Sequence, residues 1–269
     1  MPGGGEQMRK MLFFDIDGTL VDGKTQAVPD SAVMGLREAH KNGHLLFVNT
    51  GRCKSFIPEC LKEIPFDGYA YACGSHIEYQ GKVLFQEFVS MQDRDYIRDA
   101  MIETGLQGIF QGPEYCYFDH SVTPYDNLRE FLKVYDRDYH TQRKDFYAKE
   151  MEINKLVTFR TEENDYELFL ERMGDRYQLI ENGGGFTEIL PLPYTKASCM
   201  DYLMDYFHVA REDCYVFGDS PNDLPMMEHV KNSICLGNGY DSVKQISSYV
   251  TADIDKDGIY LALKHFGLI

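Results

Sequence analysis

Three short apolar runs, each followed directly by polar residues and a glycine, constrain the fold of this chain most strongly. The runs read MLFFDIDGT from Met11, HLLFVNTGR from His44 and CYVFGDSPND from Cys214. Consecutive apolar residues over so short a length are typical of strands that are covered on both faces, as in a parallel sheet. The runs therefore predict buried strands, and the polar residues lie where each strand ends.

The segment between the first two runs has the pattern of a helix. Residues 29–43 read PDSAVMGLREAHKNG, with apolar residues at helical spacing around Leu36. Asp30 or Ser31 is expected to cap the helix, and Gly43 suits its end. Strand–helix–strand units of this kind predict an α/β fold with a Rossmann-like parallel sheet. Ligands of such sheets collect at the carboxyl ends of the strands.

The middle of the chain has a different pattern. From 81 to 188 the sequence is richer in Tyr, Phe and charged residues, and strand-like pieces alternate with helix-like pieces. We interpret this stretch as a second, α+β domain that is inserted into the first. Residues 1–80 and 189–269 are then expected to form the parallel-sheet core, and 81–188 the insertion.

Composition limits the classes of partner. The chain has 269 residues, 43% hydrophobic and 26% charged, with a formal net charge of −16. This composition is that of a globular protein, and the charge argues against non-specific binding to nucleic acid or to anionic membranes. The seven cysteines form no CxxC pair, and no run has the length of a membrane span. We expect a cytoplasmic protein with reduced thiols, whose oligomeric state the sequence leaves open.

Four acids follow the predicted strands. Asp15 and Asp17 come after the first run, and Asp219 and Asp223 after the last. If the sheet is parallel, these turns meet at one edge, where the carboxylates would raise one another's pKa unless a cation lies between them. Mg²⁺, which prefers oxygen ligands and leaves positions for phosphate and water, is the expected ion.

Donors for a phosphate group are also present. In the sequence PYTKASC, Thr195 is a good cap, so Lys196 is expected in the first turn of a helix, where a cation opposes the helix dipole. A bound anion would resolve that conflict. Thr50 and Gly51 offer a hydroxyl and a backbone N–H at another strand exit. A nucleophile, a metal and anion-binding donors together indicate phosphoryl transfer.

Four motifs in this order resemble those of the haloacid dehalogenase (HAD) superfamily. They are DIDGTL at 15–20, NTGR at 49–52, TK at 195–196 and GDSPND at 218–223. More narrowly, they are similar to those of the Cof-type sugar-phosphatase branch. The resemblance implies that the insertion is a cap domain that sets substrate specificity and closes over the core. It also implies a phosphatase that acts on a small phosphorylated metabolite, with sugar phosphates as the first expectation.

The resemblance implies a role for each motif residue. Asp15 would attack phosphorus and form an aspartyl-phosphate, and Asp17 would protonate the leaving oxygen and then activate water. Asp15, the carbonyl of Asp17 and the side chain of Asp219 would bind Mg²⁺, with Asp223 as support for the metal shell. The expected phosphate contacts are Thr50, Gly51, Lys196 and Asn222.

Other interpretations of these residues stay open. Arg52 would either contact the substrate or pair with a surface acid. A phosphomutase of the phosphomannomutase type would use the same core with a similarly placed cap. A catalytically weak phosphate sensor is a third interpretation, but it would not need both Asp15 and Asp17. Acids and glycine alone can also simply form a turn, and it is the four motifs in order that disfavour this reading.

Overall fold

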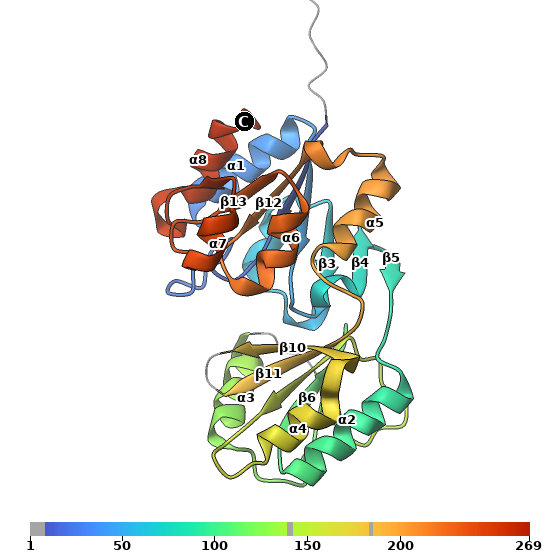
Figure 1. Ribbon diagram of the computed structural model, residues 1–269. Helices are drawn as coiled ribbons and strands as arrows, with labels where there is room; N and C mark the ends of the chain where they lie inside the picture. The colour runs from blue at the N-terminus through green and yellow to red at the C-terminus, as the bar shows by residue number, and fades with distance from the viewer. Residues whose placement is uncertain (1–8, 139–141, 183–184) are drawn as a thin grey trace, which may run out of the picture. The chain divides into compact units, whose positions relative to one another are not determined.

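The computed structural model describes residues 9–138, 142–182 and 185–269, which form two compact units (Figure 1). The core unit comprises the described residues up to Gly51 together with Glu59–Leu84 and Thr195–Ile269. The inserted unit comprises Arg52–Pro58 and Phe85–Tyr194. The sequence suggested an insertion at 81–188. The compact unit differs from this range at both ends and includes a further short segment after the second strand.

An eight-stranded sheet organises the core unit, in the order β14-β13-β12-β1-β2-β3-β4-β5. Pairing is parallel from β14 to β3, and β4 runs antiparallel to β3. The strands are β1 (Met11–Phe14), β2 (Leu45–Asn49), β3 (Gly68–Tyr71), β4 (His76–Tyr79), β5 (Lys82–Gln86), β12 (Cys214–Gly218), β13 (Asn232–Cys235) and β14 (Tyr249–Val250). The predicted parallel-sheet α/β fold is thus confirmed.

Aromatic side chains fill both faces of this sheet. Phe13 of β1 stacks on Phe47 of β2 with ring centroids 5.7 Å apart, and Phe47 also contacts Phe207 of the helix that precedes β12. On the other face, Phe14 stacks on Phe217 of β12 at 4.5 Å. Burying one such side chain contributes about 1.5–3 kcal/mol. The continuous apolar runs are explained by this burial on both faces.

Helices of the core unit lie on both sides of the sheet (Figure 1). They are α1 (Asp30–Lys41), α5 (Ser198–Phe207), α6 (Leu224–His229), α7 (Asp241–Ile246) and α8 (Gly258–His265). α1 packs against α8, and α6 against α7. The expected side-chain cap of α1 is wrong: the helix begins at Asp30 itself and Pro29 occupies the cap position. Its predicted end is confirmed, because Gly43 follows α1 with φ +90°.

The start of α5 also differs in detail from the expectation. Thr195 Oγ1 accepts from the Ser198 N–H at 3.2 Å, and Ser198 Oγ accepts from the Thr195 N–H at 3.0 Å. The helix begins at Ser198, so Lys196 lies in the turn that leads into α5 and not in its first turn. The predicted cap at Thr195 is therefore wrong: Ala197 occupies the cap position of α5 without a side-chain cap, and Thr195 only closes the turn that precedes the helix.

The inserted unit is built on a six-stranded sheet in the order β10-β11-β9-β6-β7-β8. Its strands are antiparallel except for the parallel pair β7 and β8. The strands are β6 (Gln107–Gln111), β7 (Tyr115–Phe118), β8 (Gln142–Asp145), β9 (Lys155–Phe159), β10 (Tyr177–Asn182) and β11 (Phe186–Pro191), and the helices are α2 (Met91–Thr104), α3 (Asp126–Asp138) and α4 (Tyr166–Met173). α2 packs against α4, over a core rich in aromatic residues such as Phe110 and Phe169.

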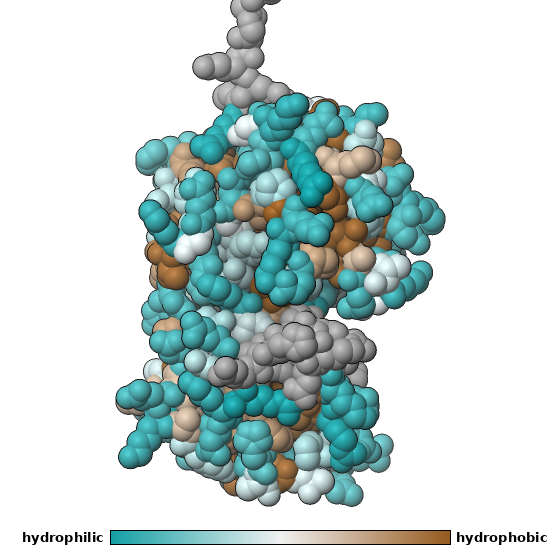
Figure 2. All heavy atoms as spheres, turned by 180° about the vertical axis from the view of Figure 1, so that it is seen from behind, coloured by the Kyte–Doolittle hydropathy of each residue, from teal (hydrophilic) through white to brown (hydrophobic). Residues whose placement is uncertain are grey.

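The segment Arg52–Pro58 belongs to the inserted unit because its side chains pack there. Ser55 Oγ donates to the carbonyl of Gly112 at 2.7 Å, and Phe56 packs against Phe131 with centroids 6.3 Å apart. Hydrophilic side chains cover most of the face of each unit that Figure 2 shows. Within the described residues, no helix has the length and apolar character that crossing a membrane requires.

Candidate active site

Parallel pairing brings three polar turns of the core unit to one edge of its sheet. Phe14 lies in register with Val48 of β2 and with Phe217 of β12. The residues that follow these positions therefore leave the sheet at the same edge, as predicted from the sequence. The Asp15 N–H still donates to the Phe217 carbonyl at 3.0 Å, which fixes the start of the first turn against β12.

One buried lysine lies between two of the acids. Lys196 Nζ donates to Asp15 Oδ1 at 2.5 Å and to Asp223 Oδ1 at 2.6 Å, and all three side chains are almost fully buried. The negative charge that compensates Lys196 thus comes at least in part from the protein itself. The sequence suggested a bound anion for that task, so the two carboxylates are a correction to the expected surroundings of Lys196.

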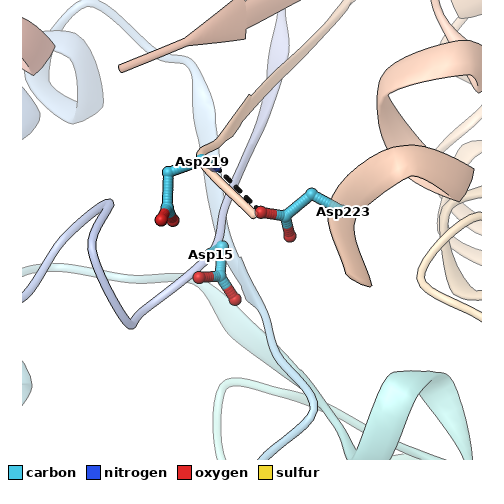
Figure 3. Close-up of side chains that lie close together, drawn as sticks. All are labelled: Asp15, Asp219 and Asp223. Atoms are coloured by element: carbon cyan, nitrogen blue, oxygen red, sulfur yellow. Dashed lines mark hydrogen bonds between the residues drawn. The ribbon is translucent and has the colours of Figure 1, made fainter. Parts of the chain in front are cut away.

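Asp219 and Asp223 are held by their local backbone. Asp223 Oδ2 accepts from the N–H groups of Asp219 and Ser220, at 2.9 and 3.0 Å. Asp223 follows Pro221 in a short 3₁₀ turn, and its carboxylate caps that turn. Asp219 Oδ1 accepts from the hydroxyl of Thr19 at 2.8 Å. Figure 3 shows Asp15, Asp219 and Asp223 side by side, and oxygens of the three lie within 4.8 Å of one another.

Two glycines are required by this crowding. Gly18 has φ +82°, and a Cβ there would lie 2.8 Å from Asp219 Cγ. A Cβ on Gly218 would lie 2.7 Å from Asp223 Oδ2. Contacts this short are not seen for real Cβ atoms, so the two glycines allow the backbone to approach the carboxylates closely. The glycines that end the first and last apolar runs are therefore part of the site.

Charge in this cluster is unbalanced. Burial raises the pKa of Asp15 well above its ordinary value; Lys196 acts against this shift, and Asp223, Asp17 and Asp219 add to it. Burial and the charge of Asp223 likewise raise the pKa of Asp219 to about 7. Burial acts to lower the pKa of Lys196, but Asp15 and Asp223 raise it, so the side chain is a cation. Three carboxylates and one ammonium leave a formal charge of two minus, which one divalent cation would neutralise.

The oxygens of the cluster suit such a cation. Both oxygens of Asp223 already accept hydrogen bonds from Lys196 or the backbone. Asp15 and Asp219 each use only Oδ1, and their Oδ2 atoms accept no hydrogen bond from any described residue. Two carboxylate oxygens at an acidic, buried point fit a hard metal ion. Asp223 is better placed to orient Lys196 and Asp219 than to bind the metal itself.

The sequence predicted five further site residues, four in the core unit and one in the inserted unit. Thr50 and Gly51 follow β2 directly and are buried, and the Thr50 N–H donates to Ala70. Asn222 is half-buried in the turn before Asp223, where its Oδ1 accepts from the Ser220 hydroxyl at 2.7 Å. The side chain of Asp17 is exposed. Arg52 belongs to the inserted unit, where its Nη1 donates to the Phe56 carbonyl at 2.9 Å.

Sequence reasoning missed two residues that touch the site. Thr19 was seen only as part of a motif, yet its hydroxyl orients Asp219. Asn49 was not singled out, yet its side chain is fully buried and bonds to the backbone of Lys196. An asparagine at the end of an otherwise apolar strand was the available signal, because a buried amide needs partners.

Comparison with known proteins gives a consistent result. The sequence model of the haloacid dehalogenase-like hydrolases matches residues 12–263. A Bacillus subtilis (strain 168) protein named "Putative phosphatase YkrA" is 26% identical over 268 residues, which are 97% of this chain and 98% of the relative. The 5-amino-6-(5-phospho-D-ribitylamino)uracil phosphatase YwtE of the same organism is 23% identical over 278 residues, 93% of this chain and 95% of the relative.

A solved structure is similar over the same length. The HAD subclass IIB sugar phosphatase BT4131 superposes with a TM-score of 0.84 at 28% sequence identity. The superposition covers 97% of this chain and 100% of that one. The similarity therefore extends over both units of the chain and is not limited to the motifs.

Proposed function

This chain belongs to the haloacid dehalogenase-like hydrolases and is a phosphatase of their Cof-type branch, and we propose that it hydrolyses a small phosphorylated metabolite with Mg²⁺ as its cofactor. A sugar phosphate is the proposed substrate class, supported by the similarity to BT4131, whose name is that of a sugar phosphatase. The observation that carries the proposal is Lys196 in contact with Asp15 and Asp223, beside the raised pKa of Asp219.

Asp15 is the proposed nucleophile. Its carboxylate attacks phosphorus, the ester bond to the metabolite breaks, and an aspartyl-phosphate forms. Lys196, whose Nζ lies 2.5 Å from Asp15 Oδ1, favours the ionised carboxylate against the larger effect of burial and is close enough to hold a phosphate oxygen. Thr50, the Gly51 N–H and Asn222 are proposed to hold the other phosphate oxygens, because they follow strands that end at the same edge.

Asp17 is the proposed acid and base. It gives a proton to the oxygen of the leaving metabolite and then takes one from the water that hydrolyses the aspartyl-phosphate. Its exposed side chain can exchange protons with solvent between the two steps. Asp15 is buried and paired with Lys196, so it is not suited to that task.

Mg²⁺ would be held by the Oδ2 atoms of Asp15 and Asp219. The carbonyl of Asp17 is a proposed third ligand, which the resemblance of the first motif to the family implies. When bound, the ion neutralises charge on the phosphoryl group as it is transferred. Thr19 and Asp223 orient the ligands, since they bond to the side chain and the backbone N–H of Asp219. We propose in addition that the inserted unit selects the substrate and shields the reaction, with Arg52 as a candidate contact.

Phosphate release from a panel of substrates tests the proposal. The panel holds sugar phosphates, phosphorylated sugar alcohols, nucleotides and an aryl phosphate, each with Mg²⁺, with chelator and with Asp15→Asn. We expect turnover that requires the metal and falls by at least about 10⁴-fold in the variant. Conversion of a sugar 1-phosphate into its isomer without release would indicate a phosphomutase. Folded, metal-loaded protein that turns over no substrate would contradict the proposal and support a sensor.

A further inference from the structure

Asn49 connects two of the segments that carry proposed phosphate-binding residues, namely the end of β2 and the turn that contains Lys196. It is the last residue of β2 and directly precedes Thr50. Its Nδ2 donates to the carbonyl of Lys196 at 2.8 Å, although the two residues are 147 positions apart. The side chain of Asn49 is fully buried. The end of β2 is therefore tied to the turn before α5 by one side-chain amide.

A second bond reinforces this connection. The thiol of Cys199 lies 3.2 Å from Asn49 Oδ1 and 3.1 Å from the Lys196 carbonyl. Burial raises the pKa of Cys199, so the side chain stays a neutral thiol and can donate. Asn49 thus uses its amide nitrogen on the turn that precedes α5, at Lys196, and its carbonyl oxygen on the start of α5, at Cys199. Such a paired arrangement fixes both the distance and the orientation of the turn.

From these contacts we infer that Asn49 is a positioning residue, which holds Lys196 in place relative to Thr50 and Asp15. The inference rests on the proposed function, since it concerns the phosphate site of that reaction. Lys196 Nζ reaches both Asp15 and Asp223 within 2.6 Å, and its backbone is fixed by Asn49. Without the amide, the Lys196 turn would be free to move away from β2, and a shift of about 1 Å in such a site can cost on the order of 100-fold in rate.

Direct binding of inorganic phosphate is the appropriate test, because it needs no substrate and no turnover. Calorimetry with Mg²⁺ present compares wild type with Asn49→Ala and Asn49→Leu; the leucine variant fills the volume if the alanine variant does not fold. We expect the dissociation constant of phosphate to rise about tenfold or more in both variants. The apparent dissociation constant rises only in inverse proportion to the folded fraction, so a variant that denaturation curves show to be at least about 90% folded would keep the wild-type constant if Asn49 had only a structural role.

Asn232 provides the matched control. Its Nδ2 also bonds to backbone carbonyls, those of Glu212 and Cys214, at 2.9 and 3.0 Å. It lies in the same unit, at the opposite edge of the sheet, where β13 begins. Asn232→Ala is expected to keep the phosphate dissociation constant within about twofold of wild type.

Each outcome decides between the possible accounts. An unchanged constant in the Asn49 variants, or an equal rise in Asn232→Ala, overturns the inference while the proposed function stands. Wild-type protein that binds phosphate but hydrolyses no ester contradicts the proposed function alone, and the Asn49 comparison still holds. Wild-type protein that does not bind phosphate at all overturns the inference.

Discussion

In the core unit, Lys196 lies among three buried carboxylates, whereas the buried cations of the inserted unit lie beside partly exposed acids. Lys155 pairs with Glu188 at 2.9 Å, and Arg94 with Asp95 at 2.7 Å. The side chains of Glu188 and Asp95 are 20% and 43% exposed, so water shares in balancing those charges. In the core unit, Asp15 and Asp223 are both within 5% of full burial.

This difference distinguishes an ion pair with a structural role from a charged cluster that binds a ligand. A buried pair whose charges cancel can hold elements together, and it needs no further partner. A buried cluster with more acids than bases is unstable by itself, as the raised pKa values of Asp15 and Asp219 indicate. Such a cluster is retained where a ligand completes it. The excess of carboxylates over cations, more than the number of charges, is therefore the reason to place the phosphatase site in the core unit.

Removing each buried lysine would test the comparison most strongly. Lys196→Met leaves Asp15 and Asp223 without their cation, and we expect phosphatase activity to fall by about 10³-fold. Lys155→Met leaves only a partly exposed acid, and kcat on an aryl phosphate should change by no more than about threefold. Because breaking a buried pair costs about 3–5 kcal/mol, denaturant unfolding should show a loss of stability in Lys196→Met.

The comparison would break if the two variants lost activity to the same degree. Full activity in Lys196→Met would equally remove the lysine from the proposed phosphate site. Denaturation curves for both variants, measured under the assay conditions, serve as the control that each protein is folded.

Two glycine substitutions sharpen the account of the crowded turn. Gly18 and Gly81 both have positive φ, but only Gly18 has the Asp219 carboxylate where a Cβ would lie; nothing lies within 4 Å of that position at Gly81. Gly81→Ala should therefore cost about 1–2 kcal/mol of backbone strain without loss of activity. Gly18→Ala should cost at least as much stability, and in addition lower kcat by about tenfold by displacing Asp219.

Unfolding free energies and kcat values for both alanine variants check this expectation. Equal kcat values would mean that the turn tolerates a side chain and that the position of Asp219 is not critical.

The smallest expected effect is on the stability of the inserted unit and comes from Asp93, whose charge is balanced by Arg176. Hydrogen bonds from Tyr177 and Ser90, with the charge of Arg176, hold the pKa of Asp93 below its ordinary value of 3.8. A carboxyl whose pKa is lower in the folded state contributes stability above pH 3.8, and this contribution is lost as the pH falls through the folded-state pKa. Because the side chain of Asp93 is 34% exposed, the effect is small.

Thermal unfolding of wild type and Asp93→Asn between pH 7 and pH 3 measures this contribution. We expect the two melting temperatures to approach each other as the solution becomes more acidic. A difference between the two melting temperatures that increases toward pH 3 would contradict this expectation.

Local pattern predicted the elements of the fold well. The apolar runs became β1, β2 and β12, and the helical spacing after Pro29 became α1. Burial on both faces of a parallel strand is encoded in consecutive residues, so a single run is enough to predict it. The family motifs then placed Asp15, Lys196, Asp219 and Asp223 at one site, and the structure brings these four together.

Contacts between distant residues could not be predicted in the same way. That Lys196 pairs with two acids depends on side-chain geometry across three turns, 181 and 27 residues apart in the chain. The bond from Asn49 to the Lys196 carbonyl has no local signal beyond one polar residue at a strand end. The attachment of Arg52–Pro58 to the inserted unit depends on the packing of Ser55 and Phe56, which no periodicity reveals.

Calorimetric titration of Mg²⁺ into metal-free protein tests the central claim most directly, namely that the excess negative charge of the core unit is a cation site. Wild type, Asp219→Asn and Glu188→Gln are compared, so that one acid is neutralised in each unit. We predict one Mg²⁺ bound by wild type and by Glu188→Gln, and none by Asp219→Asn, which lacks a ligand. Equal binding by all three proteins, or phosphatase activity that persists in chelator without bound metal, would contradict the account.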